Sequence, residues 1–178
     1  MTKLIFEKAI PKRDKIFVSF GIVNYEDCFC LKLKLKEKVD VDVIVEKLII
    51  SFPYWIKILL KFRNFLAIFF GLKTGNIENN YRFDEKLDLN QAHYFGDIYI
   101  LLKNEDHLIG ELKDKHLDFR FSIELIKERD EAFVLLKTIV KYNNFFGRSY
   151  FFIVKPFHRI IVPNILKRLS NELISAKL

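Results

Sequence analysis

The segment HLDFRFSIELIKERDEAFVLLKTIVKY spans residues 116–142. Apolar side chains recur at every second position in both halves of this segment, a period that is typical of half-buried β-strands. The polar run 127–131 separates the two halves. We therefore expect two strands, at 116–126 and 132–142, that pair in an antiparallel manner through a short connection.

Similar patterns extend this pair toward the N-terminus. Residues 96–103 and 107–113 read as two more strands, because the turn-forming residues Asn104, Glu105 and Asp106 lie between them. Residues 16–36 also predict a strand, in which Phe29, Leu31, Leu33 and Leu35 alternate with lysines and Cys30. An earlier short run, Ile16 to Phe20, either pairs with this strand or leads into it. The lysine face of the strand is expected to lie in solvent, which would discourage pairing at a sheet edge.

Two helices are expected between the first strand and the meander. Asp40 or Asp42 can cap a helix from about Val43 to Ser51, and Pro53 suits the first turn of a second helix, 54–70. The residues after it, 74–93, read as a loop that could contain a short turn of helix or a strand. The longest uncharged stretches in this region are nine residues long. A membrane-spanning helix needs roughly 20 apolar residues, so neither helix is expected to cross a bilayer.

A long helix is expected from about Phe146 to the C-terminus. Apolar residues recur there at three- and four-residue spacing, which predicts one buried face. The residues of this face are Tyr150, Val154, Phe157, Ile161, Ile165 and Leu169. Pro156 and Pro163 interrupt the pattern, and we expect Pro156 to kink or restart the helix because proline cannot donate the backbone hydrogen bond.

The expected fold is therefore of the α+β class, a single domain over residues 1–178. A curved antiparallel sheet that grips a long C-terminal helix resembles the helix-grip arrangement of START-like (SRPBCC) domains. A different α+β sandwich is the alternative.

A motif in the C-terminal helix resembles one in an uncharacterised bacterial family. Gly147-Arg148-Ser149-Tyr150-Phe151 is followed, four residues later, by Pro156-Phe157-His158, similar to G-x-x-Y-[FW]-x4-P-F-H in that family. Weaker similarities lie at Pro53-x-Trp55, Arg63-Asn64, Phe70-Gly71-Leu72 and His116–Arg120. The resemblance supports the START-like fold and implies no catalytic residues. Because no Gly-rich phosphate motif is present, no nicotinamide or other cofactor is expected.

Positive charge is concentrated in two segments of a chain whose net charge is +7. Residues 47–73 and 146–178 carry +5 each, which suggests an anionic partner or simply solvated helix faces. The helix 54–70 could lie on a membrane surface, with Trp55, Lys57, Lys61 and Arg63 as its contacts. Nucleic acid is not expected, because the aromatic residues recur at the spacing of a helix core.

Cys28 and Cys30 are the only cysteines. They lie two residues apart on one strand face, too close for a mutual disulfide, and no nearby histidine completes a zinc pattern. We expect free thiols, no metal and a cytoplasmic protein, at most peripheral to the inner face of the membrane. The N-terminal residues contain no apolar core of the length of a signal peptide.

Six residues are candidates for a ligand-binding site. His116, Asp118 and Arg120 alternate on one strand face with Ser122, and this face either lies in solvent or lines the mouth of a cavity. Arg120 could also simply pair with Asp118. His158 could orient a polar group or bond to a neighbouring carbonyl, and Arg148 lies near a helix start that favours anions. Tyr150 belongs to the buried face of the same helix.

The excess of large apolar side chains, with 19 Phe, indicates a cavity between the sheet and the C-terminal helix. We expect it to bind a hydrophobic or amphipathic small molecule, since such sites are mostly apolar with a few polar groups. A cyclase- or hydrolase-like enzyme with His116 or His158 as general base is one alternative, and no catalytic residue is assigned. A partner-binding module without a small ligand is another. The oligomeric state is left open.

Overall fold

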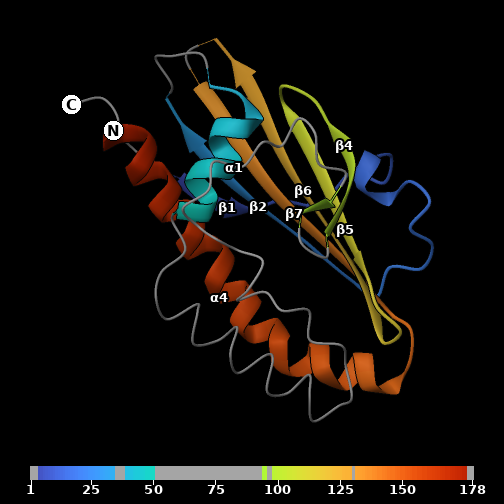
Figure 1. Ribbon diagram of the computed structural model, residues 1–178. Coiled ribbons are helices and arrows are strands. Elements are labelled where there is room, and N and C mark those ends of the chain that lie inside the picture. Colours follow the sequence, from blue (N-terminus) through green and yellow to red (C-terminus); the bar gives the residue numbers. More distant parts are fainter. Residues whose placement is uncertain (1–3, 35–38, 51–93, 96–97, 130, 176–178) are drawn as a thin grey trace.

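Within the part of the chain that the structure describes, seven antiparallel strands form one sheet, with the order β1-β2-β7-β6-β5-β4-β3. The computed structural model describes residues 4–34, 39–50, 94–95, 98–129 and 131–175 (Figure 1). The strands are β1 Leu4–Glu7, β2 Tyr25–Leu33, β3 Tyr94–Phe95, β4 Ile98–Lys103, β5 His107–Lys113, β6 Leu117–Glu128 and β7 Glu131–Tyr142. The helices are the 3-10 helix η1 Lys15–Phe17 and the α-helices α1 Val41–Ile50 and α4 Phe145–Ser175.

The meander predicted from the alternating segments is confirmed. β6 and β7 pair along their whole length, from Leu117 opposite Tyr142 to Glu128 opposite Glu131. The turn between β4 and β5 is closed by the backbone N–H of Asn104, which donates to the carbonyl of His107 at 2.9 Å. The Asn104 side chain in turn accepts from the N–H of Asp106 at 3.1 Å.

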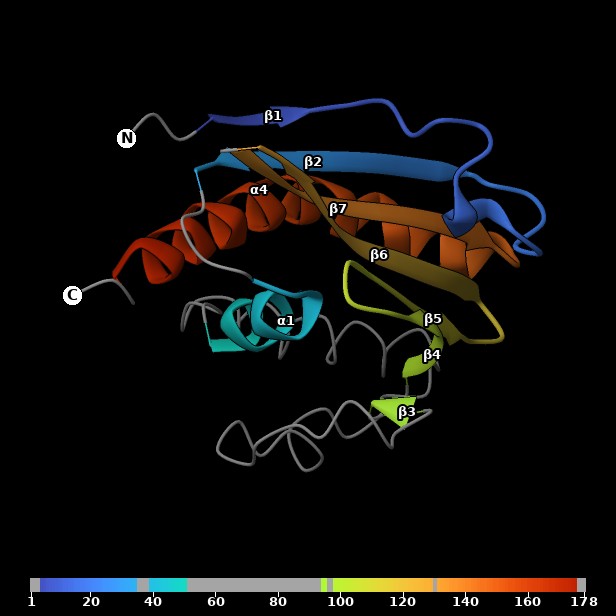
Figure 2. The ribbon, with the colours of Figure 1, turned by 90° about the horizontal axis from the view of Figure 1, so that it is seen from above.

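Both α-helices cover the same face of the sheet (Figures 1 and 2). The main core lies between this face, α1 and the C-terminal half of α4, and it contains Leu31, Ile44, Val134, Leu166 and Leu169. A smaller cluster lies under the N-terminal half of α4 and joins Tyr25, Val140 and Phe151. The predicted arrangement, a curved antiparallel sheet holding a long C-terminal helix, is the observed one.

The first predicted helix is confirmed as α1. The Asp40 side chain accepts a hydrogen bond from the N–H of Val43 at 3.0 Å, so Asp40 rather than Asp42 is the cap. The second predicted helix, 54–70, lies outside the described residues, as do Trp55, Lys57, Lys61 and Arg63. The described part of the chain contains no helix long and apolar enough to span a bilayer.

Helix α4 runs without interruption through Pro156 and Pro163. The prediction that Pro156 restarts the helix is therefore wrong, although the ribbon is curved in Figure 1. Buried side chains on both sides of Pro156, such as Phe151 and Val162, hold the two halves against the sheet and offset the lost backbone hydrogen bond. Most of the predicted face is at least half buried, but Phe157 is exposed.

The N-terminal segment differs most from expectation, because residues 8–24 cross the other face of the sheet. The run Ile16 to Phe20 is not a strand; it contains η1, which Asp14 caps by accepting from the N–H of Ile16 at 3.0 Å. Ile16 and Phe20 pack on Cys28 and Cys30 of β2, and burial is the main cause that raises the pKa of Cys28 to about 11. β2 is also not an edge strand, because β1 pairs with it.

Candidate functional site

The polar face of β6 is buried, which contradicts the expectation that it lies in solvent or at a cavity mouth. His116, Asp118, Arg120 and Ser122 are all buried. Arg120 faces the N-terminal segment, whereas His116, just before β6, lies against the start of α4. The alternating pattern of β6 correctly predicted two faces, but the polar face is covered by the segment 8–24 at Arg120 and by the β7–α4 connection at His116 and Asp118.

Arg120 is the centre of this covered face. Its guanidinium donates to Glu111 Oε1 from Nε at 3.1 Å and from Nη2 at 2.7 Å. Nη1 donates to the carbonyls of Ile16 and Val18, both at 2.7 Å. The predicted partner Asp118 instead accepts from Asn143 Nδ2 at 2.9 Å and lies 3.5 Å from Lys141 Nζ. Arg120 therefore fastens the N-terminal segment to the sheet, and no ligand-binding role is assigned to it.

His116 has a structural role at the start of α4. Asn144 Oδ1 accepts from the N–H of Gly147 at 3.1 Å and lies 3.0 Å from His116 Nδ1. Because an amide oxygen can only accept, Nδ1 carries the proton. A Cβ atom on Gly147 would lie 1.9 Å from the carbonyl oxygen of His116, so the glycine allows α4 to begin directly against the β5–β6 turn.

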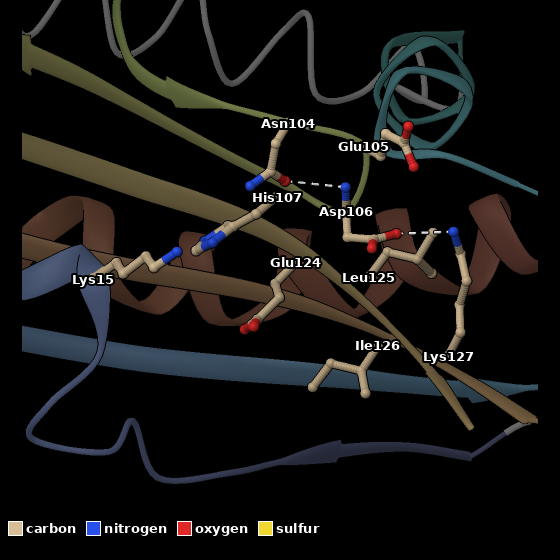
Figure 3. A pocket seen from close by; sticks show the side chains of 9 residues that line it. All are labelled: Lys15, Asn104, Glu105, Asp106, His107, Glu124, Leu125, Ile126 and Lys127. Atoms are coloured by element: carbon tan, nitrogen blue, oxygen red, sulfur yellow. Dashed lines mark hydrogen bonds and ion pairs between the residues drawn. The ribbon is translucent and has the colours of Figure 1, made fainter.

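A second buried histidine lies on the covered face, at an open hollow of about 600 Å³. His107 Nε2 is 2.7 Å from the hydroxyl of Ser122. Figure 3 shows Lys15, His107 and Glu124 directed toward the same space. Glu124 is already paired, because Lys137 Nζ contacts both Glu124 and Asp14. These pairs make the hollow part of the seam between the N-terminal segment and the sheet.

His107 predicts a pH dependence of stability. Burial is the main cause that lowers the pKa of His107 below its ordinary value of 6.5. Below pH 6.5 the unfolded chain therefore binds more protons than the folded one, so this histidine reduces the free energy of unfolding as the pH falls from 7.5 to 5.5. We expect the urea midpoint to fall less over this range in His107→Gln than in wild type. Equal pH dependence of the two proteins would contradict this assignment.

The candidate site lies on the helix-facing side, where β2 meets α4. Asp27 is buried and accepts a hydrogen bond from the Tyr25 hydroxyl at Oδ2, at 2.5 Å. Nε2 of His158, on α4, is 3.0 Å from the same oxygen, without the geometry of a hydrogen bond. Asp27 Oδ1 is buried and has no hydrogen-bond partner in the structure. These three residues form the polar cluster of the helix-facing side.

The surroundings of the polar cluster are aromatic and basic. The ring of Tyr25 lies 4.8 Å from that of Phe151, and Lys155 Nζ is 5.1 Å from the Tyr25 ring centre. Burial, followed by the hydrogen bond to Asp27, raises the pKa of Tyr25 well above its usual range, so the hydroxyl stays a donor. Asp27 also borders a hollow of about 270 Å³ that is lined by residues 7–10, 26 and 27.

The structure separates the six predicted site residues. Only His158 belongs to the polar cluster. Arg148 is exposed and Tyr150 is buried on α4. Asp118 and Arg120 lie on the covered face, and His116 lies beside the start of α4. The sequence reasoning missed Tyr25 and Asp27. A signal was present, because Asp27 is the only carboxylate at the alternate positions of β2 that are otherwise filled by Tyr25, Phe29, Leu31 and Leu33.

The register of the sheet extends the site from Asp27 across three strands. Asp27 lies opposite Thr138 of β7, Thr138 opposite Phe121 of β6, and Phe121 opposite Gly110 of β5. A Cβ atom on Gly110 would lie 2.5 Å from the Phe121 ring, so the glycine makes room for that ring. We call Asp27, Thr138, Phe121 and Gly110 the cross-strand row.

Comparison with known families decides the classification. Residues 19–165 match the family described as protein of unknown function (DUF2867). The chain belongs to this family. The DUF2867 match includes β2, α1, the meander and most of α4, and thus the polar cluster and the whole cross-strand row.

This DUF2867 chain was also compared with curated proteins and with solved structures. No curated protein matches it. Among solved structures it is similar to the crystal structure of CalU16 from Micromonospora echinospora, with 12% identity and a TM-score of 0.30 over 98% of this chain and 94% of that one. A similarity of this size carries no inference about function.

The candidate site combines a hydrogen-bond acceptor with an adjacent apolar surface. A buried carboxylate oxygen without a partner is costly, and a donor from a ligand would satisfy it. Among the described residues no group of three His, Cys, Asp or Glu side chains could hold a metal ion.

Proposed function

We propose that this protein binds an amphipathic small molecule along the cross-strand row, with its polar end at Asp27 and its apolar part over Phe121. The observation that carries the proposal is the buried oxygen Asp27 Oδ1, which has no hydrogen-bond partner. Native proteins satisfy nearly all such atoms, so this oxygen calls for a hydrogen-bond donor that the described residues do not supply.

The apolar part of the proposed site is the surface of β6 on the helix-facing side. Leu117, Phe119 and Phe121 are only half buried there, and the rings of Phe119 and Phe121 stack at 6.0 Å. Phe121 lies two strands from Asp27, a span of about 10 Å at the usual strand spacing. A chain of about eight or more carbons would bridge this distance.

The polar end of the ligand follows from the chemistry of the cluster. A carboxylate oxygen accepts hydrogen bonds and repels negative charge. The proposed ligand therefore carries a donor, an ammonium or hydroxyl group, rather than a carboxylate. The rest of the ligand would lie on the apolar surface, which favours a hydrocarbon chain or ring.

The test uses dodecylamine, dodecanol and dodecanoate as probes. We expect calorimetric titration to show binding of the amine and the alcohol and weaker binding of the acid. Asp27→Asn should weaken dodecylamine binding about tenfold, because a hydrogen bond to a charged group contributes about 1.5–3 kcal/mol. Asp106→Asn, at an exposed carboxylate, is the matched control. Equal affinities of acid and amine, or an unchanged affinity in Asp27→Asn, would overturn the proposal.

An enzyme is the second candidate, because His158 and the buried Asp27 carboxylate lie 3.0 Å apart, a pair of groups that general acid–base chemistry can use. His116 has no such role, because its Nδ1 donates to Asn144 at the start of α4 and its Nε2 is buried there, away from the polar cluster. Hydrolysis of p-nitrophenyl dodecanoate that disappears in His158→Gln but persists in His116→Gln would favour this candidate.

A further inference from the structure

We propose that the end of the molecule where β7 leads into α4 docks on an anionic lipid bilayer. This surface is separate from the ligand site, and the proposal goes beyond the proposed function by naming the partner of an exposed region. We call it the docking tip, and define it by Ile22, Phe145, Phe146, Arg148 and Phe152.

The docking tip exposes large apolar side chains that a surface helix normally buries. Phe152 is 79% exposed, Phe145 is 75% exposed and Phe146 is 50% exposed. Ile22 is 70% exposed, and its loop is tied to the start of this region by Asn24, whose Oδ1 accepts from the N–H of Tyr142 at 2.7 Å. Contiguous exposed apolar residues of this size mark protein or membrane contacts.

The charge beside these residues favours an anionic partner. From Phe145 to Asn171 the helix contains no carboxylate, and Arg148 and Lys155, in the same turns as the aromatic residues, are exposed. Lys167 and Arg168, further along the helix, are exposed as well. Aromatic side chains that enter the headgroup region, flanked by basic ones that meet lipid phosphates, are the pattern of interfacial helices. A second copy of this chain would bring like charges together, so a bilayer satisfies both features better than self-association does.

The position of the docking tip also suits contact with the headgroup region of a bilayer. Phe145 and Phe152 are two helical turns apart on the exposed side of the first turns of α4, and Arg148 lies between them in sequence. The ring of Phe146 packs on the ring of His116, with the ring centres 5.9 Å apart. The aromatic residues therefore project from a rigid corner, which avoids much of the ordering entropy that a flexible loop would lose on binding.

The test is co-sedimentation with vesicles of phosphatidylcholine alone and of phosphatidylcholine with 30% phosphatidylglycerol. We expect at least tenfold stronger partitioning onto the anionic vesicles, and a steep loss at high salt. Phe145→Ser/Phe152→Ser should reduce this partitioning at least tenfold without unfolding the protein, since both side chains are exposed. Arg148→Glu should weaken it and reduce its salt dependence.

Leu4→Ser is the matched control, because Leu4 is an exposed apolar residue of β1 that lies opposite Lys32, near the far end of β2. Leu4→Ser should partition like wild type. No binding to anionic vesicles, or an equal loss in Leu4→Ser, would overturn the proposal. So would a concentration-dependent dimer that Phe145→Ser/Phe152→Ser abolishes, because the tip would then be a contact between copies. Dodecylamine titration without vesicles tests the ligand site independently, and Phe145→Ser/Phe152→Ser should leave that affinity unchanged.

Discussion

Replacing Arg120 with alanine should lower the free energy of unfolding by about 3–5 kcal/mol, the usual cost of removing one partner of a buried ion pair. The Arg120 side chain is only 4% exposed and that of Glu111 only 6%. Arg120→Ala would leave the carboxylate with only the exposed Lys113 as an ionic partner. It would also remove the donor from the carbonyls of Ile16 and Val18.

Urea denaturation, with circular dichroism as the signal, measures this effect. Lys127→Ala is the control, because Lys127 and Asp106 form an exposed ion pair that contributes at most about 1 kcal/mol. The double variant Arg120→Met/Glu111→Leu should recover much of the loss, since a buried ion pair can be replaced by apolar residues at little cost. A loss below that of Lys127→Ala would show that the N-terminal segment is not held by Arg120.

Alanine at Gly147 should also destabilise the protein, by about 3 kcal/mol. Helix propensity alone predicts the opposite sign, because alanine in a helix is favoured over glycine by about 1 kcal/mol. The expected reversal comes from the close approach of α4 to the β5–β6 turn. The new Cβ would lie 1.9 Å from the carbonyl oxygen and 2.7 Å from the carbonyl carbon of His116, and backbone atoms cannot move aside as a side chain can.

Thermal and urea unfolding of Gly147→Ala give the measurement, and Arg148→Ala is the matched control on the next, exposed residue. Arg148→Ala should lie within about 0.5 kcal/mol of wild type. A Gly147→Ala variant that is as stable as wild type or more stable would mean that α4 can move away from His116 without cost. The close approach of α4 to His116 would then not explain why the C-terminal motif has glycine at position 147.

Much of the motif in the C-terminal helix now has a physical reason. Gly147 permits the contact with His116, Tyr150 and Phe151 are buried, and His158 reaches Asp27. Its spacing was visible in the sequence, whereas the partners were not. Each partner lies on another element, and helical spacing specifies only the residues that share a face of the same helix.

The local elements of this protein follow from its sequence. Period-two alternation predicted the meander to within a few residues, and three- and four-residue spacing predicted α4. A cap at Asp40 or Asp42 predicted α1 from about Val43, two residues after its observed start at Val41. These signals are local because they depend on side chains within a few positions of one another. The apolar face of β6 was also identified correctly as the one that meets the helices.

Only the tertiary structure determined that the polar face of β6 is buried and where the candidate site lies. Alternation divides a strand into two faces but does not say what covers each of them, so His116, Asp118 and Arg120 were expected in solvent or at a cavity. The segment 8–24 covers Arg120, which donates to its carbonyls, whereas His116 and Asp118 contact Asn144 and Asn143 of the β7–α4 connection. Asp27 and His158 come together only because the sheet places β2 beneath α4, a long-range contact that no local pattern encodes.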